Sequence, residues 1–149
     1  MKYLKTFESL KDKLENIDIV KKNFEYIKTD LDDICLDVTD DYFNARISFI
    51  SNDKASLLIW KSDPDGSKLY NSFEWSPFEY SLVGDIVDRV KEYFRQSEYC
   101  DYWKTQVIVP NDRGKMYDLD SDVLDREDMI KSGYQLITAI QIVFKIRNI

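Results

Sequence analysis

The first 41 residues carry a helical pattern of apolar positions. Steps of three and four residues separate the members of two successive apolar sets, so each set would lie along one helix face. The first set is Tyr3, Phe7, Leu10, Leu14 and Ile17, and the second is Val20, Phe24, Ile27, Leu31, Ile34 and Val38. Because the phase shifts between the sets near residues 16–18, the pattern predicts two or three N-terminal helices, with Thr29 as a candidate helix cap.

A coiled-coil seam is the alternative to helices that pack into a core. The first set has heptad spacing, which would allow homo-oligomers to form through the N-terminal helices. Lys21 and Lys28 fall where that seam would continue, and they argue against an unbroken one. Core packing is therefore the favoured interpretation.

From Tyr42 the period changes from helical to two. Apolar and polar residues alternate over Phe43–Phe49, which is typical of a half-buried strand, and residues 55–60 form a second candidate strand after a turn. Pro and Gly in Asp63–Gly66 predict another turn, followed by a third strand over Lys68–Trp75. The three strands would form an antiparallel meander.

The clearest local signal is an amphipathic helix after residue 75. Ser76 is a candidate N-cap, with Pro77 and Glu79 at positions that favour a helix start. Apolar residues then follow one face until about Ser97: Leu82, Val83, Ile86, Val87, Val90, Tyr93 and Phe94. Charged residues occupy the opposite face, as expected for a solvent-exposed side.

The rest of the chain predicts a hairpin, a short helix and a long strand. Alternation from Trp103 to Val109 and residues 115–119 would form the hairpin, and Ser121–Lys131 the helix. Tyr134–Arg147 is apolar on both faces, so it should lie centrally in the sheet. The expected fold is α+β with a mostly antiparallel sheet. We expect one domain over residues 1–149, in which the helical segment 1–41 packs on an α+β core, 42–149.

Composition restricts the partners and the cellular compartment that we expect for this chain. The chain has 149 residues and a net charge of −7, which opposes direct binding to nucleic acid. No stretch is apolar enough for a membrane span and no secretory signal starts the chain, so we expect a cytoplasmic protein without membrane contact. Reduced thiols follow from that compartment, with a Cys35–Cys100 disulfide as the alternative.

Candidate chemistry is limited by what the chain lacks. It contains no histidine and four scattered glycines, which excludes histidine-based catalytic and metal sites and glycine-rich phosphate loops. We therefore assign no catalytic residue, cofactor or metal ligand. Asp118, Asp120 and Asp122 begin like a calcium loop, but Val123 and Met129 stand where an EF-hand needs Gly and Glu. A looser divalent-cation site, and with it a carboxylate- or metal-dependent enzyme, remains an alternative.

Acidic residues concentrate in two blocks, residues 30–41 and 118–128. Together with exposed aromatic residues, such blocks can bind a basic protein surface. The candidate partner-binding residues are Asp30, Asp33, Asp37, Asp40, Asp41, Asp118, Asp120, Asp122, Tyr99 and Tyr102.

Two short stretches resemble known proteins. The opening Met1–Leu10 (MKYLKTFESL) resembles the start of many small uncharacterised proteins of large tailed bacteriophages, and Leu31–Phe43 (LDDICLDVTDDYF) looks like a segment that recurs in them. The resemblance covers about a third of the chain. The resemblance implies that the protein acts in the cytoplasm of a phage-infected bacterium. It does not imply any particular activity.

The expected function is that of a non-catalytic protein-binding module, which engages a host or phage protein through acidic and aromatic surface. Its sharper form is an inhibitor that counters host defence, or mimics nucleic acid in a basic groove. A minor virion or assembly component is the alternative, with the N-terminal helices as its oligomerisation element.

Overall fold

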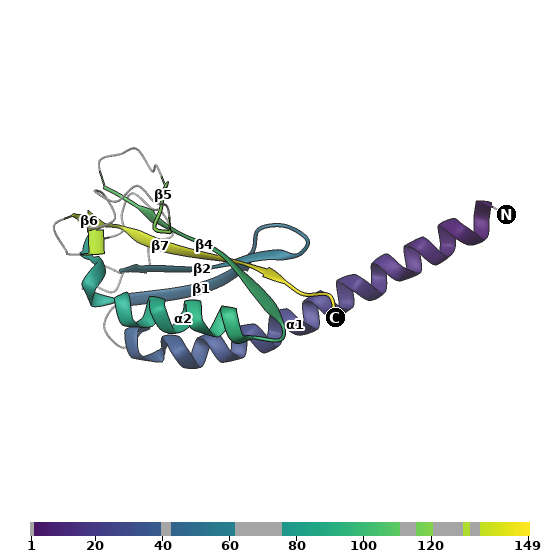
Figure 1. The fold of residues 1–149 in the computed structure, drawn as a ribbon, viewed down its shortest axis with the longest axis horizontal. Coiled ribbons are helices and arrows are strands. Elements are labelled where there is room, and N and C mark those ends of the chain that lie inside the picture. The colour runs from purple at the N-terminus through teal and green to yellow at the C-terminus, as the bar shows by residue number, and fades with distance from the viewer. Residues whose placement is uncertain (1, 40–42, 62–75, 111–115, 121–129, 132–134) are drawn as a thin grey trace.

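The computed structural model describes residues 2–39, 43–61, 76–110, 116–120, 130–131 and 135–149. A five-stranded sheet has two helices on one face, and the N-terminal helix extends past the sheet (Figure 1). All described strand pairs are antiparallel. The predicted α+β class with a mostly antiparallel sheet is therefore confirmed.

The N-terminal region is a single helix, α1, from Lys2 to Thr39, so the prediction of two or three helices was wrong. No Gly or Pro interrupts these residues, and nothing in the backbone chemistry forces a break. Thr29 lies inside the helix, where its hydroxyl donates to the carbonyl oxygen of Glu25 at 3.0 Å rather than capping a terminus. The phase shift instead marks a change of environment, because the second apolar set packs on the sheet and Leu10, Leu14 and Ile17 of the first are exposed.

The sheet order is β1-β2-β7-β4-β5. These strands are β1 (Phe43–Phe49), β2 (Lys54–Lys61), β7 (Ala139–Ile146), β4 (Cys100–Ile108) and β5 (Met116–Asp118). The C-terminal strand is central, as its apolar faces predicted, and it fills the place beside β2 that a meander would give to a third strand. The predicted strand over residues 68–75 lies outside the described residues. The predicted hairpin is confirmed by the pairing of β5 with β4, its turn lying outside the described residues.

A second, two-stranded sheet corrects the predicted helix start. Phe78–Glu79 form β3, which pairs with β6 (Leu136–Ile137), so Ser76 is not a helix cap. A 3₁₀ turn, η2 (Tyr80–Leu82), follows, and α2 runs from Gly84 to Gln96. Phe78 is buried, and its burial and pairing with a distant segment outweigh the local N-cap signal. Thr138 separates β6 from β7, which divides the predicted long C-terminal strand in two.

The end of α2 and its buried face agree with the sequence. The N–H of Ser97 donates to the carbonyl oxygen of Tyr93 at 2.9 Å, which closes the last turn. Phe94 is fully buried and stacks on Phe144 of β7, with ring centroids 4.3 Å apart. Leu82 departs from the expected face, since it precedes α2 and is exposed. Of the predicted helix over residues 121–131, Ile130 and Lys131 are helical and residues 121–129 lie outside the described part.

A β-bulge in β4 reverses the expected sides of two aromatic residues. The register with β7 shifts between Tyr102 and Lys104, so the extra residue Trp103 breaks the alternation. Tyr102 is opposite the buried Phe144, on the side of the helices, and Trp103 is exposed. The ammonium groups of Lys54 and Lys104 lie 4.2 and 4.6 Å from the Trp103 ring centroid. Regular alternation would have placed Trp103 among the core residues.

Candidate functional site

The first acidic block lies on the part of α1 that faces α2. Asp30 accepts a hydrogen bond from the Tyr93 hydroxyl at 2.6 Å, and Asp37 pairs with Arg89 at 3.2 Å. Asp33 belongs to the same stripe, since it is three residues from one and four from the other, and it is exposed. Two of the three described candidates in this block therefore also join the helices. Asp40 and Asp41 lie outside the described residues.

A shallow groove of about 660 Å³ opens where the end of α1 meets the start of α2. We call it the helix groove, and its lining residues are Asp37, Val38, Leu82, Asp85, Ile86, Asp88 and Arg89. Among the described residues, three carboxylates and one guanidinium border it, so their net charge is negative. Leu82 is 57% exposed and adds an apolar contact surface. Acidic and apolar groups together suit a partner segment that presents Lys or Arg beside an apolar side chain.

Only Asp37 of the helix groove was among the candidates predicted from sequence. Asp85, Asp88 and Arg89 were interpreted as the solvent-exposed side of an amphipathic helix, which they are. Their three- and four-residue spacing placed them together on α2, but no local signal showed that this side borders the acidic stripe of α1. The groove depends on how two segments some 50 residues apart in the chain pack together.

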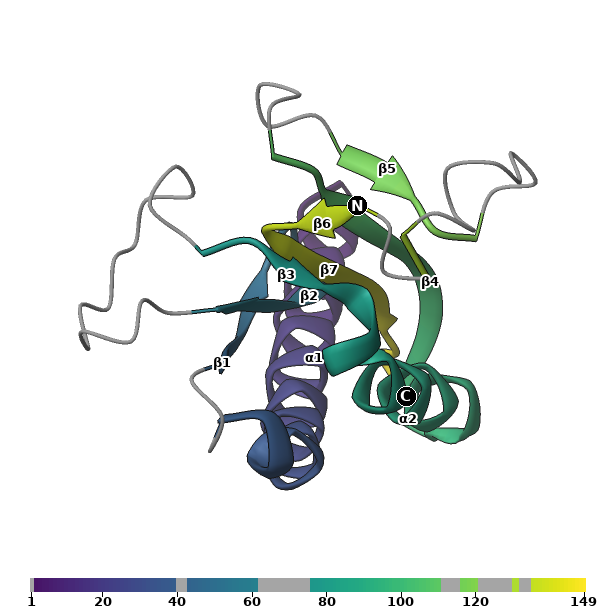
Figure 2. The same ribbon diagram turned by 90° about the vertical axis from the view of Figure 1, so that its left-hand side faces the viewer.

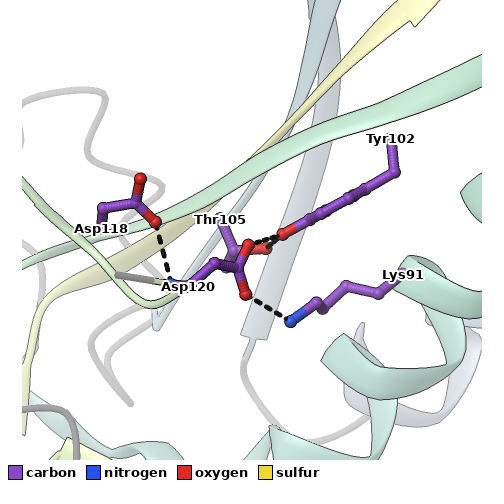
Figure 3. A network of polar contacts seen from close by, with 5 residues as sticks. All are labelled: Lys91, Tyr102, Thr105, Asp118 and Asp120. Atoms are coloured by element: carbon purple, nitrogen blue, oxygen red, sulfur yellow. Dashed lines mark hydrogen bonds and ion pairs between the residues drawn. The ribbon is translucent and has the colours of Figure 1, made fainter. Parts of the chain in front are cut away.

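Asp118 and Asp120, the described aspartates of the second acidic block, belong to a network between β4, the end of β5 and α2 (Figure 3). One carboxylate oxygen of Asp120 accepts from the Lys91 ammonium at 2.8 Å, and the other accepts from the Tyr102 hydroxyl. The Tyr102 hydroxyl also lies 2.7 Å from that of Thr105, and Asp118 accepts from the Asp120 backbone N–H at 2.9 Å. These residues hold elements of the fold together. Asp122 lies outside the described residues.

The protonation states in this network follow from its contacts. Partial burial opposes ionisation of Asp120, but hydrogen bonds from Lys91 and Tyr102 outweigh it and hold the pKa of the carboxyl below its usual range. Burial, and then the hydrogen bond to Asp120, raise the pKa of Tyr102. Near neutral pH the pair is thus a carboxylate and a protonated phenol, which suits a structural link and gives no base at Tyr102.

Tyr99 and the two cysteines also contact the body of the protein. Tyr99, which directly precedes β4, stacks on Tyr26 of α1 with ring centroids 5.1 Å apart, so its ring contacts the N-terminal helix. Cys35 and Cys100 are both buried and free, and the alternative disulfide is not formed. Burial raises the pKa of each thiol to about 11. Both cysteines are thus protonated at neutral pH.

A second hollow of about 440 Å³ lies between α1, the turn after β1 and the C-terminal tail. Its charged residues pair with one another: Lys145 with Asp53 at 3.7 Å and Arg147 with Asp101 at 2.5 Å. The buried Asn23 amide donates to the carbonyl oxygen of Arg147 at 2.9 Å, which holds the tail on α1. Because the charges cancel, this hollow has no electrostatic preference comparable to that of the helix groove.

Metal-binding clusters and membrane-spanning helices are absent from the residues that the structure describes. No three His, Cys, Asp or Glu side chains in them are grouped so that they could hold a metal ion. No helix in the same ranges is both long and apolar enough to cross a membrane.

Comparison with known proteins gave no match to this chain among protein-family models, curated proteins or solved structures. The resemblance to small bacteriophage proteins therefore stays a prediction from its two short stretches of sequence.

Proposed function

We propose that this chain is a non-catalytic binding module that engages a basic segment of a protein partner through the helix groove. The observation that carries the proposal is the groove itself, where carboxylates from two helices border an exposed leucine. Asp33 extends this acidic surface along α1. The net charge of −7 would also attract a basic partner before contact.

The ion pair inside the groove can exchange for a partner's charge. Arg89 and Asp37 have side chains that are 53% and 76% exposed, and exposed pairs of this kind contribute about 0–1 kcal/mol. A partner guanidinium can therefore replace Arg89 at Asp37 at little cost. The released Arg89 remains in solvent, so no charge is left buried.

The sharper form of the proposal is an inhibitor encoded by a bacteriophage, acting in the bacterial cytoplasm on a host protein with a basic groove. Its support is the acidic surface, which can occupy a site made for nucleic acid, and the resemblance of the N-terminal stretches to small phage proteins. A second candidate, a virion or assembly component, is favoured by the exposed N-terminal half of α1 (Figure 1). Mass spectrometry of purified particles separates the two, since an inhibitor would be absent from them.

The groove is tested by charge reversal with a matched control. The double variant Asp33→Lys/Asp85→Lys changes one exposed residue that lines the groove, Asp85, and one exposed residue that lies a helical turn before its Asp37. The variant Asp12→Lys/Glu15→Lys makes the same charge change on the N-terminal half of α1. Affinity capture from bacterial lysate at low salt should recover the same partner with the wild type and the control. The groove variant should recover at least about tenfold less, which corresponds to a loss of about 1.4 kcal/mol.

A defined probe makes the test independent of the lysate. Fluorescence anisotropy with a labelled peptide that alternates Arg and Leu should show binding that weakens as NaCl is raised. The proposal fails if no partner is captured above background, or if the two double variants lose binding equally.

A further inference from the structure

The N-terminal half of α1 carries an exposed apolar stripe, whose last residue, Ile17, also lines the hollow beside the C-terminal tail. The helix continues past the ends of the strands (Figure 1), and in the view turned by 90° it recedes behind the strands, away from the viewer (Figure 2). Leu10, Leu14 and Ile17 are 56%, 62% and 46% exposed. In proteins, most of the stability of an amphipathic helix comes from packing its apolar face, which this stripe does not yet do.

The stripe has the spacing of a coiled coil. Leu10, Leu14 and Ile17 are separated by four and three residues, and Tyr3 and Phe7 continue this spacing towards the N-terminus of the sequence. In heptad notation Phe7 and Leu14 are at a positions, with the other three at d positions. At 100° per residue, the stripe lies about a quarter turn around the helix from the face that packs on the sheet. A partner could therefore reach it while α1 stays docked.

The seam ends where the helix joins the body. The next heptad position after Ile17 is Lys21, which is exposed, and Val20 is the first α1 residue of the buried core. The apolar seam therefore matches the protruding length of α1. Heptad surfaces are self-complementary, and two identical copies related by a twofold axis meet this requirement without any further partner.

We propose that the N-terminal half of α1 pairs with the same segment of a second copy as a parallel coiled-coil dimer. Its orientation follows from the flanking charges. Lys13 is at a g position and Asp18 at the e position five residues later, so a parallel dimer places each Lys13 beside Asp18 of the other copy. An antiparallel pairing about Leu10 and Leu14 would instead bring the two Lys13 side chains together. Dimerisation and partner binding use different faces of α1, so each can fail without the other.

The dimer is tested with neighbouring substitutions that introduce the same residue. Leu10→Glu places a carboxylate in the seam, and Ser9→Glu places it one residue away, outside the seam, at another exposed position. Sedimentation equilibrium of the full chain should show a dimer for the wild type and for Ser9→Glu. Leu10→Glu should raise the dissociation constant about a hundredfold or more, because each seam loses a buried leucine and gains a charge.

The orientation is tested by cross-linking. Leu10→Cys should form an intermolecular disulfide under mild oxidation, because equivalent d positions face each other only in a parallel pair. Ser9→Cys is the matched control, and the buried Cys35 and Cys100 should not compete. A wild type that stays monomeric at about 200 μM, or equal effects of the two Glu variants, would overturn the dimer. A wild-type dimer whose Leu10→Cys variant does not cross-link would overturn the parallel arrangement.

Discussion

Asp120 offers the sharpest test of how the acidic residues act in the folded state. The substitution Asp120→Asn keeps the shape of the side chain and removes its charge. Lys91 and Tyr102 both donate to this carboxylate, and the Lys91 side chain is only 15% exposed. The variant would leave the ammonium of Lys91 without its counter-ion in a place where water reaches it poorly.

The expected loss is about 2 kcal/mol. Hydrogen bonds to charged groups contribute about 1.5–3 kcal/mol, but the Asp120 side chain is 33% exposed, so solvent screening reduces its share. The remaining amide oxygen still accepts one hydrogen bond, which keeps the estimate near the lower half of that range. With a urea m value of about 2 kcal/mol per molar, the unfolding midpoint should fall by about 1 M.

The pH dependence of this difference gives an independent check. The pKa of Asp120 is lowered in the folded state, so its contribution is present above the unfolded pKa of about 3.9 and is lost as the pH falls through the folded value. The wild type and Asp120→Asn should therefore converge in stability below about pH 4. The pKa of Tyr102 is raised partly by Asp120, so Asp120→Asn should bring its alkaline titration, followed at 295 nm, towards pH 10.

Urea unfolding followed by tryptophan fluorescence measures both the loss of stability at pH 7 and its dependence on pH. Equal midpoints for the wild type and Asp120→Asn at pH 7 would refute the reasoning, as would a difference that stays constant down to pH 3. A double-mutant cycle with Tyr102→Phe isolates the contact between the two side chains, because they are direct neighbours. The losses in unfolding free energy of the two single variants should sum to more than the loss of the double variant.

Two further predictions concern the core. Cys35 and Cys100 should not react with Ellman's reagent at pH 8 in the folded protein, and both should react in denaturant. Because burial raises the pKa of each thiol from 9.0 to about 11, the free energy of unfolding should also fall as the pH rises from 9 through 11. Phe94→Ala should cost about 3–5 kcal/mol in urea unfolding, since Phe94 is fully buried against Phe144, whereas Leu82→Ala, at an exposed site, should cost less than about 1 kcal/mol. Reactive native thiols, or similar losses for Phe94→Ala and Leu82→Ala, would contradict this account.

Local patterns predicted the parts of the fold that depend on periodicity alone. Alternation in Phe43–Phe49 identified β1, and the apolar face from Val83 to Phe94 identified α2. The central place of β7 followed from its apolar residues on both sides. Each of these signals arises within a few residues, because the backbone repeat decides which side chains share a face.

Predictions failed where a distant segment decided the outcome. The N-cap signal at Ser76 was overridden because Phe78 pairs with Ile137, about 60 residues away. The bulge at Trp103 could not be inferred, since it depends on the register between β4 and β7. The acidic residues show the same division: composition identified the block that contains Asp30 and Asp37, but only the packing of α2 brought Tyr93 and Arg89 to them.

The sequence by itself determined the α+β class, the acidic charge and the exclusion of histidine chemistry, because composition and periodicity carry these properties. Tertiary structure decided which faces are covered. It divided the helical pattern of α1 into a docked half and an exposed half, and it placed acidic residues from two helices around one groove. The physical reason is that a pattern shows which side chains seek burial or solvent, and only long-range packing selects their neighbours.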